Sequence, residues 1–205
     1  MWNAGFRPDF TLAMERILRS RDPGNRVAWF RGEGRAVVLL GETREELGGS
    51  EWLALRRGLE AGTPPSVDLD AEARLHSLLV RAVAEGLLET AHDVSNGGLA
   101  VALAECCFTA PDAVGVGARI ELEDGIRPDA LLFGESTGRV IAATADADAL
   151  CAAARDAGVS ARRIGVTGGD RLTVGSPGAE AWIERPVAAL RELWSRALPR
   201  RLETE

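Results

Sequence analysis

The stretch AHDVSNGGLAVALAECCF, residues 91–108, joins a polar segment directly to an apolar run. Because the run is apolar on all sides, it predicts a helix over Gly97–Phe108 that other elements enclose. Ser95 or Asn96 is the predicted cap, and the glycine pair lets backbone N–H groups be approached closely. The positive end of the helix dipole would then face an anion, which favours a phosphate-bearing ligand. The alternative is structural: Asp93, Ser95 and Asn96 form a turn and cap a core helix.

Short strands and helices are predicted on both sides of this junction. Upstream, the apolar runs 27–30 and 36–40 have the pattern of a β-hairpin, and a helical segment follows the glycine pair Gly48-Gly49. Asp70 is the expected N-cap of an amphipathic helix that runs to about Leu88. Downstream, we expect strands over 115–122 and 139–145, a helix over 146–157, a hairpin of strands 163–166 and 171–174, and a helix that Pro186 opens and Pro199 ends. This order predicts an α/β (α+β) fold, a mixed β-sheet flanked by helices.

Composition excludes several classes of function. The chain has 205 residues, of which 46% are hydrophobic, and this suits one domain plus a smaller piece. Its net charge is −7 with both signs interspersed, so we expect no nucleic-acid partner. No run reaches the roughly 18 uncharged apolar residues of a membrane span, and the start lacks the apolar core of a signal peptide. Its three cysteines have no metal-ligand spacing and indicate a reducing compartment, so a cytoplasmic protein without a metal site is expected.

Three segments, taken in order, resemble the C-terminal part of phosphoribosylformylglycinamidine synthase, a purine-biosynthesis enzyme of the aminoimidazole ribonucleotide synthetase superfamily. The resemblance covers about residues 27–200. It implies that 63–205 form the C-terminal-type α/β domain and that 27–62 are the tail of a truncated N-terminal-type domain, with the polar, proline-bearing segment 58–69 as linker. Residues 1–26 stay unassigned, with one short amphipathic helix predicted over 11–18. The three segments are GETREELGGSE (41–51), HDVSNGGLAVALAE (92–105) and LFGESTGR (132–139).

The resemblance implies part of an ATP-dependent carbon–nitrogen ligase. The family converts formylglycinamide ribonucleotide, ATP and ammonia from glutamine into the amidine, ADP and phosphate. ATP and Mg²⁺ are implied for the complete enzyme, and neither is assured for this chain. Because the family's principal ATP, magnesium and catalytic histidine motifs lie upstream of anything present here, we assign no catalytic residue and expect the isolated chain to be inactive. The implied partners are the missing N-terminal portion or a homologous subunit, and a glutaminase component; apolar surface left by the truncated domain also favours self-association.

Candidate binding residues come from all three segments. The wall that faces the substrate is predicted from Asp93, Ser95, Asn96, Gly97 and Gly98. Glu135 and Ser136 are predicted to face the same cleft, although a turn at the entry of a strand explains their neighbouring glycines equally well. Gly48, Gly49 and Ser50 are weaker candidates for a nucleotide phosphate. The family usually has Asp where this chain has Asn96, which removes a carboxylate from that position.

Two alternatives remain open from the sequence. The first is a domain from another member of the superfamily: a selenophosphate synthetase, a thiamine-phosphate kinase or a hydrogenase-maturation dehydratase. Segments 41–51 and 133–139 favour the purine enzyme over these. The second is a non-catalytic remnant that binds a phosphorylated metabolite or a homologous partner, and Asn96 gives this alternative some support.

Overall fold

One mixed sheet organises the chain in the computed structural model, which describes residues 28–109, 115–123 and 125–202. The predicted helix over 11–18 lies outside the described residues. Among the strands of the described residues, only the neighbouring pair β3 and β6 is parallel; the others are antiparallel. The strands are β1 (Ala36–Leu40), β2 (Thr90–Asp93), β3 (Ala118–Glu121), β4 (Val140–Thr144), β5 (Ala161–Thr167), β6 (Arg171–Gly175) and β7 (Ala181–Pro186), in the spatial order β2-β4-β1-β5-β3-β6-β7.

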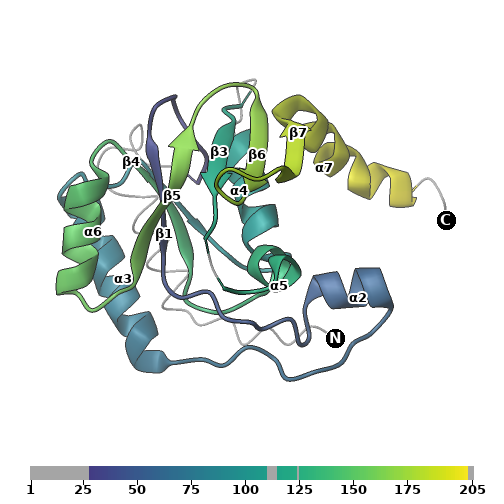
Figure 1. Cartoon of the computed structure of the whole chain (residues 1–205), viewed down its shortest axis with the longest axis horizontal. Helices are drawn as coiled ribbons and strands as arrows, with labels where there is room; N and C mark the ends of the chain where they lie inside the picture. Colours follow the sequence, from purple (N-terminus) through teal and green to yellow (C-terminus); the bar gives the residue numbers. More distant parts are fainter. Residues whose placement is uncertain (1–27, 110–114, 124, 203–205) are drawn as a thin grey trace.

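Helices cover both faces of this sheet (Figure 1). Helices α3 (Leu69–Ala84) and α6 (Ala147–Asp156) lie on one face, and α4 (Gly98–Phe108), α5 (Pro128–Phe133) and α7 (Val187–Leu202) lie on the other. A short helix, α2 (Glu51–Arg57), lies beside α5 at the edge of the molecule. The predicted fold class, a mixed sheet flanked by helices, is confirmed.

The central strands are buried on both faces, which explains their continuous apolar sequences. In β1, Val37 and Leu39 belong to the core around α4, whereas Val38 and Leu40 belong to the core around α3 and α6. Strand β4 divides its residues between the two cores in the same way. A strand with helices on both faces has no polar side, so the usual alternation is lost. In β3, by contrast, Arg119 and Glu121 are exposed, as expected for a strand covered on one face.

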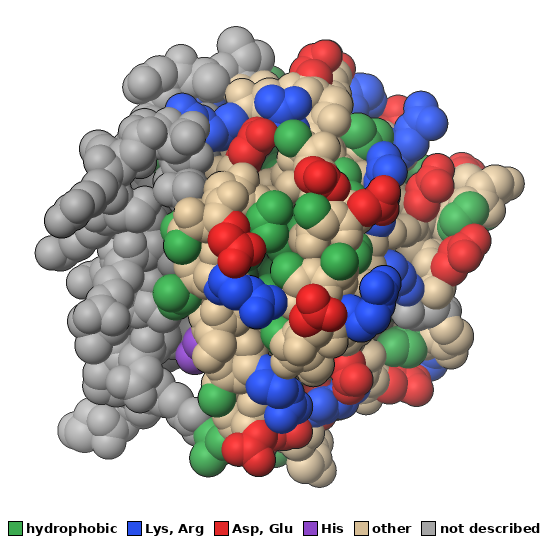
Figure 2. Space-filling model, turned by 90° about the vertical axis from the view of Figure 1, so that its left-hand side faces the viewer, with side chains coloured by type: hydrophobic (Ala, Val, Ile, Leu, Met, Phe, Trp, Pro, Cys, Tyr) green, Lys and Arg blue, Asp and Glu red, His purple; other side chains and the backbone are tan. Residues whose placement is uncertain are grey.

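The surface over α3 and α6 carries no segregated charge. Figure 2 shows the face that lies on the left in Figure 1, and acidic and basic side chains are interspersed there with single apolar ones. Within the described ranges, no helix is both long and apolar enough to cross a membrane.

Both predicted hairpins are wrong, because strands distant in sequence pair instead. Strand β1 pairs with β4 and β5, and residues 28–30 of the predicted partner run form no strand. Strand β3 lies between β5 and β6, and it pairs parallel with β6. Two apolar runs separated by a turn-like segment resemble a hairpin locally, but the sheet order is set by burial of both faces of the central strands.

The position of β1 bears on the predicted boundary at residue 62, and the domain division itself stays a prediction. That division assigns residues 27–62 to a preceding domain, whereas β1 is a central strand between β4 and β5. A boundary at residue 62 therefore does not separate two sheets. Segment 58–66 still has no helix or strand, as the linker prediction implies.

Several helix ends differ from the prediction. Asp68, not Asp70, caps α3, because its carboxylate accepts from the backbone N–H groups of Asp70 and Ala71. Strand β7 and helix α5 were not predicted. Pro186 is the last residue of β7, and the predicted helix begins directly after it, at Val187. Helix α7 continues past residue 199. The bounds predicted for α4 and α6 are confirmed within one residue.

Candidate functional site

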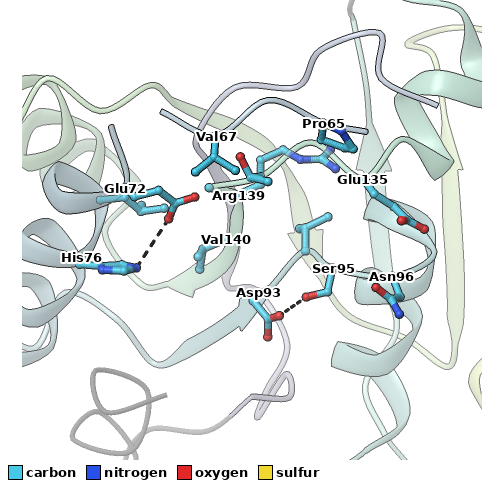
Figure 3. A pocket seen from close by; sticks show the side chains of 14 residues that line it. Pro65, Val67, Glu72, His76, Asp93, Ser95, Asn96, Glu135, Arg139 and Val140 are labelled. Carbon is cyan, nitrogen blue, oxygen red and sulfur yellow. Dashed lines mark hydrogen bonds and ion pairs between the residues drawn. The ribbon is translucent and has the colours of Figure 1, made fainter. Parts of the chain in front are cut away.

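A pocket of about 410 Å³ opens between α3 and the junction of β2 with α4 (Figure 3). Four predicted site residues line it together: Asp93, Ser95, Asn96 and Glu135. They meet because β2 pairs with β4, which places Asp93 opposite Val140 and the β2–α4 turn beside the loop that enters β4. The remaining lining residues are Pro65, Val67, Glu72, Leu75, His76, Val94, Thr137, Gly138, Arg139 and Val140.

The start of α4 is capped differently from the prediction. Its N-cap is Gly97, with φ of 80°, and the cap makes no side-chain hydrogen bond of its own. Instead the Gly97 N–H donates to Oε1 of Glu135 over 2.8 Å. The Ser95 hydroxyl donates to the carboxylate of Asp93, so the prediction that Ser95 or Asn96 caps the helix is wrong.

The same carboxylate oxygen reaches a second helix. Oε1 of Glu135 also accepts from the backbone N–H of Glu51, the first residue of α2, over 3.0 Å. First-turn N–H groups have no acceptor within their own helix, and the helix dipole favours a negative charge beside them. An anion therefore already lies at the positive end of α4, and it comes from the chain itself.

A buried cation lies beside this carboxylate. Arg139 is 2% exposed, and its guanidinium donates to the backbone oxygens of Ser136 (3.0 Å) and Gly134 (2.6 Å) and to the hydroxyl of Thr43 (3.3 Å). Burial lowers the pKa of Arg139 to about 10, against the opposing effect of the Glu46 and Glu135 carboxylates. At neutral pH the guanidinium is charged, and Arg139 is one of the residues that line the pocket.

The other predicted residues of this region lie behind the pocket wall. Ser136 is buried, and its hydroxyl oxygen accepts from the backbone N–H of Arg44 over 3.2 Å. Gly98 is buried against the loop before β4: a Cβ there would lie 2.6 Å from the Gly134 oxygen and 2.8 Å from that of Leu132. These residues position the wall, and they are absent from the residues that line the pocket.

The glycine pair before α2 has local partners. The Gly49 N–H donates to the Ala61 oxygen over 3.0 Å, and a Cβ on Gly48 would lie 2.1 Å from the Thr63 oxygen. Ser50 caps α2 by accepting from the Leu53 N–H over 3.3 Å. Segment 48–50 therefore fixes the entry to α2 and lies outside the lining of the pocket.

Sequence reasoning missed four polar residues of the pocket, Glu72, His76, Thr137 and Arg139. Glu72 and His76, one helical turn apart on α3, form an ion-pair contact of 3.7 Å, and Figure 3 shows both side chains on the wall opposite Asn96. Their i, i+4 spacing was available in the sequence, but only the pairing of β2 with β4 brings α3 to the junction. Arg139 belongs to the segment 132–139, but the sequence pattern predicts it only as the first residue of a strand. His92 is directed elsewhere, with Nε2 3.4 Å from Glu105.

Comparison of the sequence with known protein families shows the family to which the chain belongs. Residues 32–176 match the family "AIR synthase related protein, C-terminal domain", and the chain belongs to this family. Among curated relatives, phosphoribosylformylglycinamidine synthase subunit PurL of Thermomicrobium roseum is 43% identical over 175 residues, which are 82% of this chain and 22% of that protein. The PurL of Moorella thermoacetica is 47% identical over 71% of this chain and 20% of its own length. The chain thus spans about a fifth of these relatives, and the predicted resemblance is confirmed.

Solved structures show the same fold. PurL of Thermotoga maritima complexed with FGAR superposes with a TM-score of 0.67 at 22% identity, over 80% of this chain and 29% of that one. HypE of E. coli, a hydrogenase maturation protein, gives a TM-score of 0.52 at 19% identity, over 78% of this chain and 50% of that one. At these identities the likeness concerns the fold alone.

Proposed function

We propose that the chain is the C-terminal part of a phosphoribosylformylglycinamidine synthase and supplies one wall of its ribonucleotide site. The reaction would convert formylglycinamide ribonucleotide, ATP and glutamine-derived ammonia into the amidine, ADP and phosphate. The observation that supports this most directly is the meeting of Asp93, Ser95, Asn96 and Glu135 in one pocket, although they come from two separate segments.

The chemistry of the pocket suits a phosphorylated sugar. The Glu72 and Asp93 carboxylates are acceptors for ribose hydroxyl groups, whereas the Asn96 amide provides donors for carbonyl or phosphate oxygens. The buried Arg139 guanidinium adds a positive charge beside the pocket. Three carboxylates line the pocket, so a free anion would meet repulsion there unless one of them moved or a cation accompanied the ligand.

Among the residues that the structure describes, no group of three His, Cys, Asp or Glu side chains lies close enough to bind a metal ion. Segment 48–50 likewise offers no free phosphate loop, because the Gly49 N–H already donates to Ala61. T. maritima PurL has been solved with ATP and with ADP. For this chain we propose that nucleotide and Mg²⁺ bind mainly to the N-terminal portion of the synthase, where Mg²⁺ would neutralise phosphate charge.

Calorimetric titration of the full chain with formylglycinamide ribonucleotide tests the pocket. We expect saturable binding that Ser95→Ala or Asn96→Ala weakens at least tenfold, since each side chain lines the pocket. Ser77→Ala is the matched control, because this hydroxyl lies on α3 and donates to the Ala73 oxygen of its own helix. Absence of saturable heat from the unmodified chain would reject the proposed binding role.

Complementation tests the proposed activity. The pure chain should form no amidine from ATP and ammonia, whereas addition of the N-terminal portion of a synthase should restore turnover. With glutamine as nitrogen donor, a glutaminase component should be needed as well, and a T. maritima PurLQS structure supports an assembly of this kind. Turnover by the pure chain would contradict the proposal.

A non-catalytic binding module is the second candidate, and Asn96 favours it. An amide replaces the carboxylate usual in the family at a residue that lines the pocket. In that case the chain would bind the ribonucleotide or a homologous subunit, and complementation would fail even when both portions associate. Exposed apolar side chains such as Leu55 and Leu193, 79% and 61% exposed, make self-association a further proposal, which sedimentation velocity at several concentrations tests.

A further inference from the structure

We propose that two copies of this chain associate through α2, which packs antiparallel against α2 of the second copy in an apolar groove between α2, α4, α5 and β7. The inference rests on the self-association proposed above and gives it a surface and a twofold symmetry. It is independent of the ribonucleotide site, because the groove shares no lining residue with the pocket beside Asp93.

The groove exposes apolar side chains from four elements. Its volume is about 710 Å³, and α2 and α5 lie beside each other at its edge (Figure 1). Helix α4 is apolar on every side, a pattern typical of a helix that is enclosed all round. Val101 is nevertheless 39% exposed where α4 lines the groove, so this is the side of α4 that a partner would cover. Among the apolar residues that line the groove are Trp52 and Leu55 of α2, Val101 of α4, Leu132 and Phe133 of α5, and Trp182 of β7.

Helix α2 presents one stripe of side chains to this groove. The stripe consists of Glu51, Trp52, Leu55 and Arg56, and their i, i+1, i+4, i+5 spacing places them on one side of the helix. Leu55 is 79% exposed. Glu51 and Arg56 are exposed as well, and none of the ion pairs among the described residues includes either of them. The stripe therefore has an acid at one end, a base at the other and apolar residues between them.

This order of residues is complementary to itself. In an antiparallel pair related by a twofold axis through the middle of α2, Arg56 of the second copy lies beside Glu51. In the same register, Leu55 of the second copy lies beside Trp52. The axis repeats both contacts in the other direction, as a symmetric pair of subunits requires. Charge and apolar pattern therefore favour a second copy over a partner of unrelated chemistry.

The chain holds α2 in place but does not bury it. Ser50 caps the helix, and the Glu51 N–H donates to Glu135. Trp52 stacks on Phe133, with ring centroids 6.3 Å apart, yet none of the seven residues of α2 is buried. Isolated helices of fewer than about 12 residues are marginal in water, so burial against a second copy would stabilise α2. Because one short helix gives a small interface, we expect a weak dimer that forms as the concentration rises.

Sedimentation velocity of the full chain across a hundredfold range of concentration tests the surface. We expect the unmodified chain to pass from monomer to dimer, and Leu55→Gln to weaken dimerisation at least tenfold, since the dimer loses two buried leucine side chains. Leu193→Gln is the matched control, because Leu193 is 61% exposed on α7 and lies outside the lining of the groove. A monomer at every concentration, or a larger loss in L193Q than in L55Q, would overturn the inference.

An exchange of charges tests the antiparallel register. Glu51→Arg places like charges at both charge contacts of a dimer, and so does Arg56→Glu. Each variant alone should therefore associate at least threefold more weakly than the unmodified chain. An equimolar mixture of E51R and R56E should recover the lost affinity, because unlike charges meet at both contacts between the two variants. If the mixture associates no better than either variant alone, the proposed register is wrong.

Titration with formylglycinamide ribonucleotide separates this inference from the proposed site. Leu55 lies outside the pocket, so L55Q should bind the ribonucleotide as the unmodified chain does. A chain that dimerises without binding the ribonucleotide rejects the site and supports the inference, whereas a chain that binds it as a monomer at every concentration does the reverse. If the chain alone stays monomeric and the N-terminal portion of a synthase binds it but not L55Q, that portion occupies the groove and the inference is wrong.

Discussion

Replacement of Gly98 by alanine tests whether the close contact behind the pocket fixes its wall. Gly98 has φ of 67° at the first residue of α4, and it is buried. An added Cβ would lie 2.6 Å from the Gly134 oxygen and 2.8 Å from the Leu132 oxygen. Both neighbours are backbone atoms, so no side-chain rotation can make room.

The expected cost has two parts. A left-handed backbone costs an L-residue with a Cβ about 1–2 kcal/mol. Forcing a methyl group against two fixed carbonyls adds about 1–3 kcal/mol, the range for overpacking of a close-packed interior. We therefore expect Gly98→Ala to lower the free energy of unfolding by about 2–5 kcal/mol, a large share of the about 5–15 kcal/mol that stabilises an ordinary domain.

Urea unfolding followed by far-ultraviolet circular dichroism measures this cost, and the chain offers a matched control. Gly86 has φ of 74°, yet no heavy atom lies within 4 Å of the Cβ that alanine would add. Gly86→Ala therefore measures only the cost of the left-handed backbone, about 1–2 kcal/mol of the free energy of unfolding. The difference between the variants isolates the contact with the loop before β4. Equal losses of the free energy of unfolding in G98A and G86A would refute the reasoning, because the loop before β4 would then move aside for the added methyl group without an energetic cost.

Other variants test the cap, the buried cation and the buried thiols. Ser50→Ala should cost about 1 kcal/mol, seen as faster hydrogen exchange in α2, and should leave nucleotide binding unchanged. Arg139→Met should lower the free energy of unfolding by about 2–4 kcal/mol, because two backbone oxygens lose their donor; a loss below about 1 kcal/mol would contradict this. Burial raises the pKa of the Cys107 thiol to about 12. The protonated thiol therefore makes its full contribution to the free energy of unfolding below about pH 8.5, and this contribution falls by about 1.4 kcal/mol per pH unit between pH 9 and 11. Cys107→Ala should reduce this slope in urea unfolding more than Cys151→Ala, whose thiol is partly exposed.

The elements that could be predicted are those specified by their own residues. Helix α4 is apolar on every side, so its burial could be predicted without knowing which elements surround it. Helix α6 has an aspartate cap at Asp146 and a glycine after its end, and both signals are local. The two segments 92–99 and 132–139 could be recognised separately as parts of a site. Their meeting in one pocket depends on the pairing of β2 with β4 across about 50 residues, which no local pattern specifies.

Strand partners could not be predicted for the same reason. The run 36–40 is apolar at every position, and this pattern indicates burial on both faces without identifying the neighbours. A hairpin is the least costly local explanation, since it closes the shortest loop. In the structure, the pairing of β1 with β4 and β5 gives each face of the strand its own core, so the longer loops are offset by more buried apolar surface.

The misassigned cap shows how a sound rule can give the wrong partner. A helix start preceded by glycines does attract an anion, and the structure contains one. The rule concerns charge and geometry, so it is satisfied equally by a phosphate or by Glu135, 38 residues away in the sequence. Because Glu135 lies in the segment 132–139 and α4 begins in the segment 92–105, the two conspicuous motifs are chemically linked: one supplies the donors and the other the acceptor. The N–H group of Gly97 therefore already has an acceptor from the chain, and that acceptor is the reason why the helix start needs no ligand to be satisfied.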